Sequence, residues 1–447
     1  MDGNEHTVEF ITGLTWDAVP PEVQRMARMA LLDTLGAALA GTLTPISRIT
    51  ADYAAETWPG DQATILLHGK RASAIGAAFA NGCAANGIDI DDCALYTKGH
   101  PGAQIFPTAL ALAESQHLGG AQMLAAMIVG YEVAHRAARI WHATHDIYQA
   151  CGSWGSVACA AIAAHMLRLT PGQTWHAIGI ADYHAPNLPM MRDIDHPAMV
   201  KHGIGWGTMT GITAAQLAAK GFTGIPSLLG LEDYREWVSD IGQHFIMAGG
   251  LAWKGYACCA WDHAAMKGAE KLVTENRITV DEIAHVRVEA PHVTLRLGTE
   301  VPTTTEESQF NLAWPLAALL VDGEVGPSQI LEHRFDDQRI VDLANKIEIV
   351  ETDELNALYR LIERGDPRGR YAAKVILTLE DGRTFGSGIV EGNINFPQHG
   401  WNKGRLEAKF RWLTEHVLDR THIDHLVEMI WHFDQIVDVH ELTHLLT

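Results

Sequence analysis

The chain is poor in features that mark whole classes of protein. Its 447 residues carry 33 basic against 54 acidic side chains, a formal charge of −21, and its lysines and arginines form no run. Such a balance repels nucleic acid and anionic membrane surfaces, so we expect neither as a partner. A small anionic substrate remains compatible with it, because a pocket with two lysines can be positive on a negative protein.

Cysteines are also few, and they form no CxxC pair. The six are Cys83, Cys93, Cys151, Cys159, Cys258 and Cys259. Their irregular spacing in a chain of this size predicts reduced thiols and a cytoplasmic location. The first residues, MDGNEHTVEFITGL, are acidic where a signal peptide needs a basic region. The most apolar segment, residues 123–129, meets Glu132 before a bilayer could be spanned, so we expect no membrane span.

Apolar residues in the first half recur at helical spacing. Between residues 20 and 41, for example, Val23, Ala27, Leu31 and Leu35 share one face. Further helical stretches are expected at residues 72–86, 107–115, 121–139, 153–167 and 205–220. No strand alternation is visible before about residue 255, which predicts an all-helical domain.

The pattern changes after about residue 260. Residues 285–290 and 346–350 alternate with a period of two, and segments 374–379 and 384–390 flank Asp381-Gly382, a two-residue hairpin signal. Helical stretches are interleaved at 262–275, 309–320 and 353–361, and helix returns from about residue 403. The predicted fold is mainly α with an α+β second domain. Residues 1–258 and 398–447 form the all-helical domain, residues 259–397 form an inserted α+β lid, and the ligand cleft lies between them.

The sequence HELTH at residues 440–444 has the letters of a zinc peptidase. A catalytic zinc needs a third protein ligand, which such families supply downstream, and only three residues follow here. An upstream ligand such as Asp434, Asp438 or His432 fits no known pattern. Because 24 histidines make a chance match common, we predict a packed terminal helix and no metal at the active site.

A stronger signal is NGIDIDDCALYTKGHPG at residues 86–102. Asp89, Asp91 and Asp92 precede His100 in a stretch with loop character. Carboxylates beside a histidine raise its pKa and fix its tautomer, which suits proton transfer near neutral pH. Taken alone, the same letters also fit a solvated acidic turn with a capping histidine.

This segment closely resembles the corresponding segment of the MmgE/PrpD family. The typical family sequence there is an alanine-rich helix that ends in NG, then LDFDD, then HPG and a helix that ends in ALAE. Other segments agree in order and spacing: Gly221-Phe-Thr-Gly, Trp253-Lys-Gly-Tyr-Ala-Cys-Cys with His263, Ser308-Gln-Phe-Asn-Leu-Ala-Trp-Pro, and Lys409-Phe410. The resemblance implies a helical domain with an α+β lid, a homodimer, no metal or organic cofactor, and a small di- or tricarboxylate substrate. Activities in the family include 2-methylcitrate dehydration, cis-aconitate decarboxylation and iminodisuccinate epimerisation.

Carried over by position, the resemblance places Asp89, His100, Lys201 and Lys254 in the active site. The lysines would neutralise substrate carboxylates and the charge that develops as a proton leaves the α-carbon. A lysine with a lowered pKa would also serve as a base. Arg192 and Gln104 are expected to contact the substrate.

Two positions depart from the family pattern. Asp146 stands where relatives have a histidine, with His145 and Tyr148 close by, and Trp314 stands where the lyases have an aromatic hydroxyl. Tryptophan cannot exchange a proton as tyrosine can. We therefore expect Trp314 to contact the substrate only by packing, and Tyr148 or His145 to supply the missing acid/base group.

These departures favour an epimerase of a small, iminodisuccinate-like dicarboxylate, because inversion needs only two proton carriers. Either Tyr148 or His100 would remove the α-proton. Lys201, or whichever of Tyr148 and His100 is not the base, would return a proton, and Lys254 and Arg192 would bind carboxylates. A hydro-lyase of the 2-methylcitrate dehydratase kind or a decarboxylase is the alternative enzyme. A non-catalytic dicarboxylate-binding protein on the same scaffold is the alternative from another class.

Overall fold

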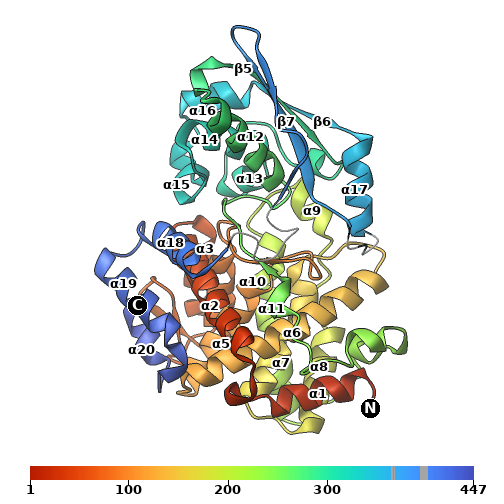
Figure 1. The fold of residues 1–447 in the computed structure, drawn as a ribbon. Helices are drawn as coiled ribbons and strands as arrows, with labels where there is room; N and C mark the ends of the chain where they lie inside the picture. Colours follow the sequence, from red (N-terminus) through yellow and green to blue (C-terminus); the bar gives the residue numbers. More distant parts are fainter. Residues whose placement is uncertain (364–365, 367, 393–400) are drawn as a thin grey trace.

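Helices from both ends of the chain build the larger part of the molecule (Figure 1). The computed structural model describes all residues except 364–365, 367 and 393–400. The N-terminal helices are α1 (Gly3–Gly13), α2 (Pro21–Gly41), α3 (Pro45–Thr57), α4 (Ala74–Ala85), α5 (Gly102–Ser115), α6 (Gly120–Thr144), α7 (Cys151–Met166), α8 (Pro171–Tyr183), α9 (Met190–Asp195), α10 (Ile204–Ala219) and α11 (Met247–Gly250). The C-terminal helices α18 (Lys403–Thr414) and α19 (Arg420–Trp431) pack on α2, and α20 (His440–Thr443) follows. The predicted fold class is confirmed.

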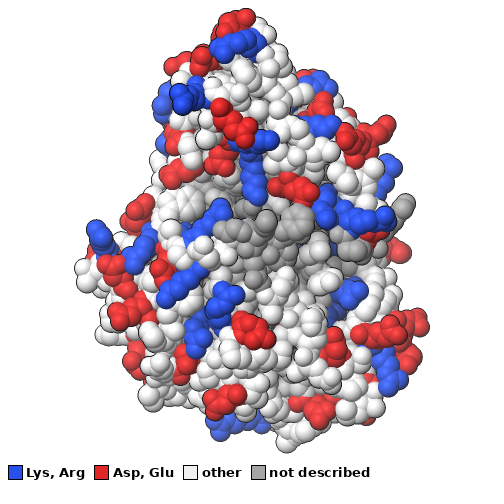
Figure 2. Space-filling model, viewed as in Figure 1, with Lys and Arg blue, Asp and Glu red and all other residues white. Residues whose placement is uncertain are grey.

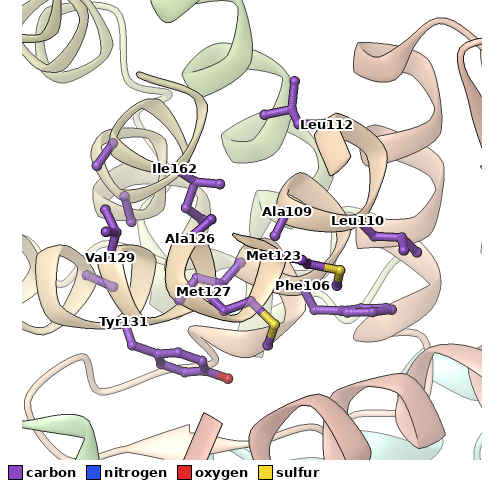
Figure 3. Close-up of a cluster of buried hydrophobic side chains, with 14 of the residues drawn as sticks. Phe106, Ala109, Leu110, Leu112, Met123, Ala126, Met127, Val129, Tyr131 and Ile162 are labelled. Atoms are coloured by element: carbon purple, nitrogen blue, oxygen red, sulfur yellow. The ribbon is translucent and has the colours of Figure 1, made fainter. Parts of the chain in front are cut away.

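Small side chains allow these helices to approach closely. A β-carbon on Gly211 of α10 would come within 2.4 Å of the β-carbon of Cys159 on α7, so only glycine permits this crossing. Larger side chains fill the remaining space: Figure 3 shows Phe106 and Leu110 of α5 close to Met123 and Met127 of α6. This rigid layer of helices carries the loops described below.

Four short strands in this part were not expected from the sequence. β1 (Ala63–Ile65) pairs antiparallel with β2 (Lys70–Ala72), and β3 (Cys93–Ala94) pairs antiparallel with β4 (Leu251–Ala252). The expectation of purely helical structure before residue 255 was therefore wrong in detail, because strands of two or three residues are too short to show a period of two. The β3–β4 pair joins the segment after Asp92 to the segment that leads to Lys254.

The lid has a mixed sheet in the order β6-β5-β7-β8, with β9 also paired to β7. Its strands are β5 (Ile283–Ala290), β6 (Ile347–Glu351), β7 (Ala372–Leu379), β8 (Thr384–Gly386) and β9 (Val390–Glu391), and its helices are α12 (His263–Asn276), α13 (Thr305–Gln309), α14 (Ala313–Asp322), α15 (Pro327–Ile330), α16 (Gln338–Ala344) and α17 (Asp353–Glu363). β5 runs parallel to β6 and antiparallel to β7. Buried Val286 and Val288 of β5 and Val375 and Leu377 of β7 form a core with residues of α12 and α14.

The predicted hairpin joins β7 and β8, but its turn is longer than two residues. Leu379 N–H donates to Arg383 O, and Gly382 N–H donates to Leu379 O, with Gly382 at φ +88°. Three residues thus form the loop, and glycine takes the left-handed position as in a bulged three-residue turn.

The expected start of the lid at residue 259 falls between β4 and α12. Its expected end, between residues 397 and 398, lies outside the described residues. No single described helix is long and apolar enough to span a membrane. Helices α2 and α3 reach that length and apolar character only when taken together, and they are bent by 91° at the break between them. On the face shown in Figure 2, acidic and basic side chains are interspersed.

Candidate active site

The acidic segment between α4 and α5 folds as a buried loop. Asn86, the C-cap of α4, donates from Nδ2 to Oδ1 of Asp91 at 2.8 Å and to Oδ1 of Asp89 at 3.3 Å. Asp92 accepts the backbone N–H of Gly102 at 2.8 Å and the hydroxyl of Tyr131 at 2.8 Å, which anchors the loop to α5 and α6. The carboxylates are thus fixed in the interior, and the alternative of a solvated acidic turn is wrong.

Asp89 is the centre of a buried charge cluster. Its Oδ2 lies 2.7 Å from Nζ of Lys254, and its Oδ1 lies 3.9 Å from Nζ of Lys201. All three side chains are at most 2% exposed. Burial alone would raise the pKa of Asp89, but Lys254 and Lys201 hold it far below its usual range. Asp89 likewise keeps the pKa of Lys254 above its ordinary value, although burial acts to lower it.

Two stacked histidines face the same carboxylate. The rings of His100 and His202 have centroids 5.4 Å apart and planes 8° apart. Nε2 of His100 lies 3.5 Å from Oδ1 of Asp89, and Nε2 of His202 lies 3.9 Å from it. Four nitrogen groups therefore surround one carboxylate.

His100 has acidic partners on its other side as well. Its Nδ1 lies 3.0 Å from the carbonyl of Asp92 and 3.3 Å from Oδ2 of Asp91. Burial lowers the pKa of His100, but the carboxylates of Asp91 and Asp89 overcome this effect and hold it well above 6.5. At neutral pH His100 is therefore an imidazolium, suited to donate a proton or bind an anion.

A run of left-handed backbone presents Lys201 and His202. Lys201, His202 and Gly203 have φ values of +35°, +57° and +63° in the 3-10 turn η2 (Lys201–Gly203). Asp89 and Lys98 also have positive φ. Such conformations cost about 1–2 kcal/mol for a residue with a β-carbon, and they concentrate at functional sites.

The lid contributes directly to the position of Lys201. Gln309 of α13 accepts a hydrogen bond from Nζ of Lys201 at 2.7 Å and donates from Nε2 to the carbonyl of Gly87 at 3.0 Å. Nζ of Lys201 also lies 4.9 Å from the ring centroid of Phe310. Residues of the Ser308-Gln309-Phe310 segment thus connect the lid to the acidic loop.

A small cavity opens beside the charge cluster. The chemically active side chains that line it are those of Asp89, Cys93, Lys98, His100, Tyr148, His202 and Tyr371. Burial raises the pKa of Tyr148 well above 10, so its hydroxyl stays protonated at neutral pH. A ligand that enters this cavity would meet imidazole and phenol groups together.

The same cluster is a poor cation site. Ligand atoms of Asp89, His100 and His202 all lie within 4.8 Å of one another, as a metal ion requires. The carboxylate of Asp89, however, is already bound by Lys254 and approached by Lys201. A cation would have to enter beside these ammonium groups, whereas an anion would be attracted by them.

Comparison with known proteins places the chain in a family. Residues 5–234 match the MmgE/PrpD N-terminal domain, and residues 256–435 match the MmgE/PrpD C-terminal domain. The chain belongs to the MmgE/PrpD family. It is 24% identical to the cis-aconitate decarboxylase-like protein oryM of Aspergillus oryzae, over 98% of this chain and 96% of that protein. It is 26% identical to the cis-aconitate decarboxylase of Homo sapiens, over 95% of this chain and 90% of that protein.

The structure brings together the residues that the MmgE/PrpD resemblance selected. Asp89 and His100 come from the loop between α4 and α5, Lys201 and Lys254 come from two further segments, and the four meet around Asp89 within hydrogen-bonding or ion-pairing distance. Tyr148 reaches the same cavity, where its hydroxyl donates to the carbonyl of Lys98. Their catalytic roles stay predictions.

Other residues predicted for this MmgE/PrpD site lie away from the cavity. Gln104 is buried between α5 and α7, where its Nε2 donates to the carbonyl of Cys151 at 3.0 Å. His145 is exposed at the end of α6 and stacks on Trp141 at 4.7 Å. Arg192 is exposed on α9.

Trp314 also points elsewhere. Its indole N–H donates to the carbonyl of Gln329 at 2.9 Å, and its ring packs against Phe335 within the lid. The lid therefore uses this position for packing.

The sequence did not single out His202, Asp193, Lys98 or Tyr371. His202 is bound to Asp193 through both its ring and its backbone. In the sequence, His202 could have been found because it follows Lys201 directly, and Lys98 because it stands two residues before His100. Tyr371, just before β7, carried no signal, because only the folding of the lid brings it to the cavity.

Proposed function

We propose that this protein is an enzyme that moves a proton at the carbon α to a carboxylate of a small di- or tricarboxylate, without a cofactor. The observation that carries the proposal is the buried cluster of Lys201, Lys254, His100 and His202 around Asp89, at the floor of a cavity. Cations gathered in a low-dielectric site stabilise the enediolate that forms when such a proton leaves. A homodimer, implied by the family, is part of the proposal.

The substrate's carboxylates would bind to the cationic side of the cavity. Nζ of Lys201 and the imidazolium of His100 both approach Oδ1 of Asp89, and His100 also lines the cavity. Lys98 lines the same cavity and would bind a second carboxylate. Three separated cations match a di- or tricarboxylate better than a monocarboxylate.

We assign the base to His202. Asp193 accepts its Nδ1 proton at 2.7 Å, and in the neutral imidazole this leaves the lone pair on Nε2, which lies 3.9 Å from Oδ1 of Asp89 in a side chain that lines the cavity. His100 is protonated, and Lys254 is held in its charged form. In our proposal, Nε2 of His202 takes the α-proton, and His100 donates a proton to the group that accepts charge.

We infer that the reaction is completed by loss of a group, as in a lyase. The two relatives named above carry the name of cis-aconitate decarboxylase and align over nearly their whole length. Moreover, Tyr148 and Tyr371 bring two hydroxyls to the cavity, so the site does not lack an acid although Trp314 replaces one. In a dehydration, the electron pair left by the α-proton would expel the β-hydroxyl, which takes a proton from His100 and leaves as water. In a decarboxylation, no α-proton is removed: carbon dioxide leaves, and a protonated side chain such as His100 gives its proton to the resulting carbanion.

An epimerase of a small dicarboxylate is the second candidate. It is favoured by Trp314, which has no hydroxyl and is turned into the lid. With the leaving-group acid of the lyases absent from that position, proton return to the same carbon is the simplest outcome.

One experiment separates these candidates. Purified protein would be incubated with a panel of di- and tricarboxylates in deuterium oxide and followed by proton NMR. A lyase gives an alkene or a decarboxylated product, whereas an epimerase exchanges solvent deuterium into the α-position with no loss of carbon or water. If no carboxylate exchanges or reacts, the proposal of carbon-acid chemistry is wrong.

A matched variant separates an enzyme from a binding protein. Lys201→Ala should abolish turnover and weaken substrate binding, with Lys220→Ala, on the surface at the end of α10, as the control. A protein that binds carboxylates in calorimetry but shows neither exchange nor product, with or without Lys201, would be a dicarboxylate-binding protein.

A further inference from the structure

A cluster of three side chains at the far side of the helical part has the composition of a metal site. His117 lies in the turn between α5 and α6, and Asp438 and His440 lie at the start of α20. Ligand atoms of these three residues, here called the surface triad, lie within 4.8 Å of one another. We propose that the surface triad binds one Zn²⁺ or a similar divalent transition-metal ion, which joins the C-terminal segment to the helical core.

The backbone holds the two halves of the surface triad together. Val439 N–H donates to the carbonyl of Leu118 at 3.0 Å, and Gly120 N–H donates to the carbonyl of Ile436 at 2.9 Å. These bonds lie just after His117 on one segment and on both sides of Asp438 on the other. The ligands are therefore placed before an ion arrives, which lowers the entropy lost on binding.

His117 occupies a backbone position that normally belongs to glycine. Leu118 N–H donates to Ala113 O, and His117 N–H to Glu114 O, which is the hydrogen-bond pattern that ends a helix with a left-handed residue. His117 has φ +53° there. Glycine or asparagine would fit this turn with less strain, so the turn alone does not explain a histidine at this position. Nδ1 of His117 lies 3.1 Å from Oδ2 of Asp438.

Two imidazoles and one carboxylate form a ligand set that zinc accepts, with water in the fourth position. Nδ1 of His440 lies 2.7 Å from Oδ1 of Asp438. Two ligand atoms on one tetrahedral Zn²⁺ are about 3.3–3.5 Å apart, so small movements suffice. The rings of His117 and His440 are stacked at 4.8 Å, and His117 must turn to aim Nδ1 at a shared ion. Its side chain is 74% exposed, which leaves room for this rotation.

Charges around the surface triad favour a cation, in contrast to those around Asp89. Within the described part of the chain, Asp438 forms ion pairs with His117 and His440 and with no lysine or arginine. Buried Glu114 places Oε1 3.8 Å from Nε2 of His440, on the ring edge away from Asp438, and the same oxygen accepts a hydrogen bond from Arg71 at 2.8 Å. The charge of Glu114 is therefore balanced by Arg71, and the carboxylate of Asp438 is the group that favours a cation at the surface triad. The arrangement uses His440 of the HELTH segment but not His444, so it is a structural site and not that of a zinc peptidase.

Zinc binding to purified apo-protein tests the proposal, measured by competition with a chromophoric chelator. Wild-type protein should bind one Zn²⁺ that His117→Ala lacks, and the affinity at this site should fall by more than about tenfold. His422→Ala is the matched control, because His422 pairs with Asp419 at 2.7 Å on α19 but has no third ligand among the described residues. It should bind zinc as the wild type does.

Cobalt provides a second measurement that does not depend on counting ions. Co²⁺ added to the wild type and to His422→Ala should give the visible absorption of a nitrogen- and oxygen-ligated ion, and His117→Ala should lose that band. Equal zinc uptake and equal cobalt spectra in His117→Ala and wild type would overturn the proposal. The surface triad would then be a cluster of charges on Asp438 without an ion.

Discussion

Nδ1 of His202 and Oδ2 of Asp193 lie 2.7 Å apart, and the backbone N–H of His202 reaches the same oxygen at 2.7 Å. Burial acts to raise the pKa of Asp193, but His202 lowers it, so the aspartate is an ionised acceptor. The pair therefore fixes one tautomer of the imidazole, with its proton on Nδ1. This arrangement prepares Nε2 to act as a general base.

Replacing Asp193 by asparagine should impair the base without removing it. The amide can donate to Nδ1, which favours the tautomer with its proton on Nε2. We expect the rate of α-proton exchange, for the carboxylate identified in the NMR screen, to fall at least about 10²-fold while KM changes little. Asp195→Asn, on the exposed side of the same helix where Asp195 pairs with Arg296, is the control. Equal activity of the two variants would show that Asp193 does not orient the base.

The pair of Asp89 and Lys254 should be strongly coupled in stability. Lys254→Met leaves a buried carboxylate without its closest cation, and Asp89→Asn leaves Lys254 without its anion; each should destabilise the fold by about 3–5 kcal/mol. Because both variants remove the same contact, the double variant should lose at least about 1 kcal/mol less than the sum. Urea unfolding of the four proteins measures this. Additive losses would mean that the two groups do not stabilise each other.

Asp92 should make the fold less stable as the pH rises. Burial and the nearby carboxyls of Asp91 and Asp33 raise the pKa of Asp92 from 3.8 to about 7. The folded state then binds more protons than the unfolded state between these values, so the contribution of Asp92 is most favourable below pH 4 and is lost as the pH approaches 7. Asp92→Asn removes this dependence and can still accept the N–H of Gly102. Its stability relative to the wild type should rise by a few kcal/mol between pH 4.5 and 8.

Parallel stability curves for Asp92→Asn and wild type over this range would contradict the assignment. Asp61→Asn, in an exposed turn before β1, provides the control and should follow the wild type.

Local patterns in the sequence predict the parts of this fold that depend on local structure. The repeat of Val23, Ala27 and Leu31 predicts α2, and the period of two at residues 285–290 predicts β5. The loop from Asp89 to His100 is found because the acidic residues and the histidine stand within one short segment. The sequence could not predict which way a side chain points. Trp314 faces the lid interior, where Phe335 packs against it, and no periodic pattern predicts such a contact.

His202 was missed for a related reason. Its contact with Asp193 requires a left-handed turn that no helical or strand periodicity announces. The link between Lys201 and Gln309 likewise exists only because the lid packs on the helices. A contact such as that of Lys201 with Gln309, 108 residues away, leaves no local pattern.

Lys409 and Asp33 connect the C-terminal helix α18 to the N-terminal helix α2. Nζ of Lys409 on α18 lies 2.6 Å from Oδ1 of Asp33 on α2 and 2.8 Å from the carbonyl of Ile90, next to Asp89. Both side chains are at most 4% exposed. Lys409→Met should therefore destabilise the protein by about 3–5 kcal/mol and loosen the acidic loop.

The size of this loss should depend on pH. Burial raises the pKa of Asp33 to about 6 even though Lys409 acts to lower it, so without Lys409 the carboxyl takes up a proton more readily. At pH 5 the variant can neutralise Asp33, whereas at pH 8 it must bury a bare carboxylate or pay to protonate it. Urea unfolding of Lys409→Met should show a larger deficit at pH 8 than at pH 5, and Lys403→Met, exposed on the same helix, should show none at either. A deficit that stays constant with pH would mean that Lys409 stabilises α18 by packing and not by its charge.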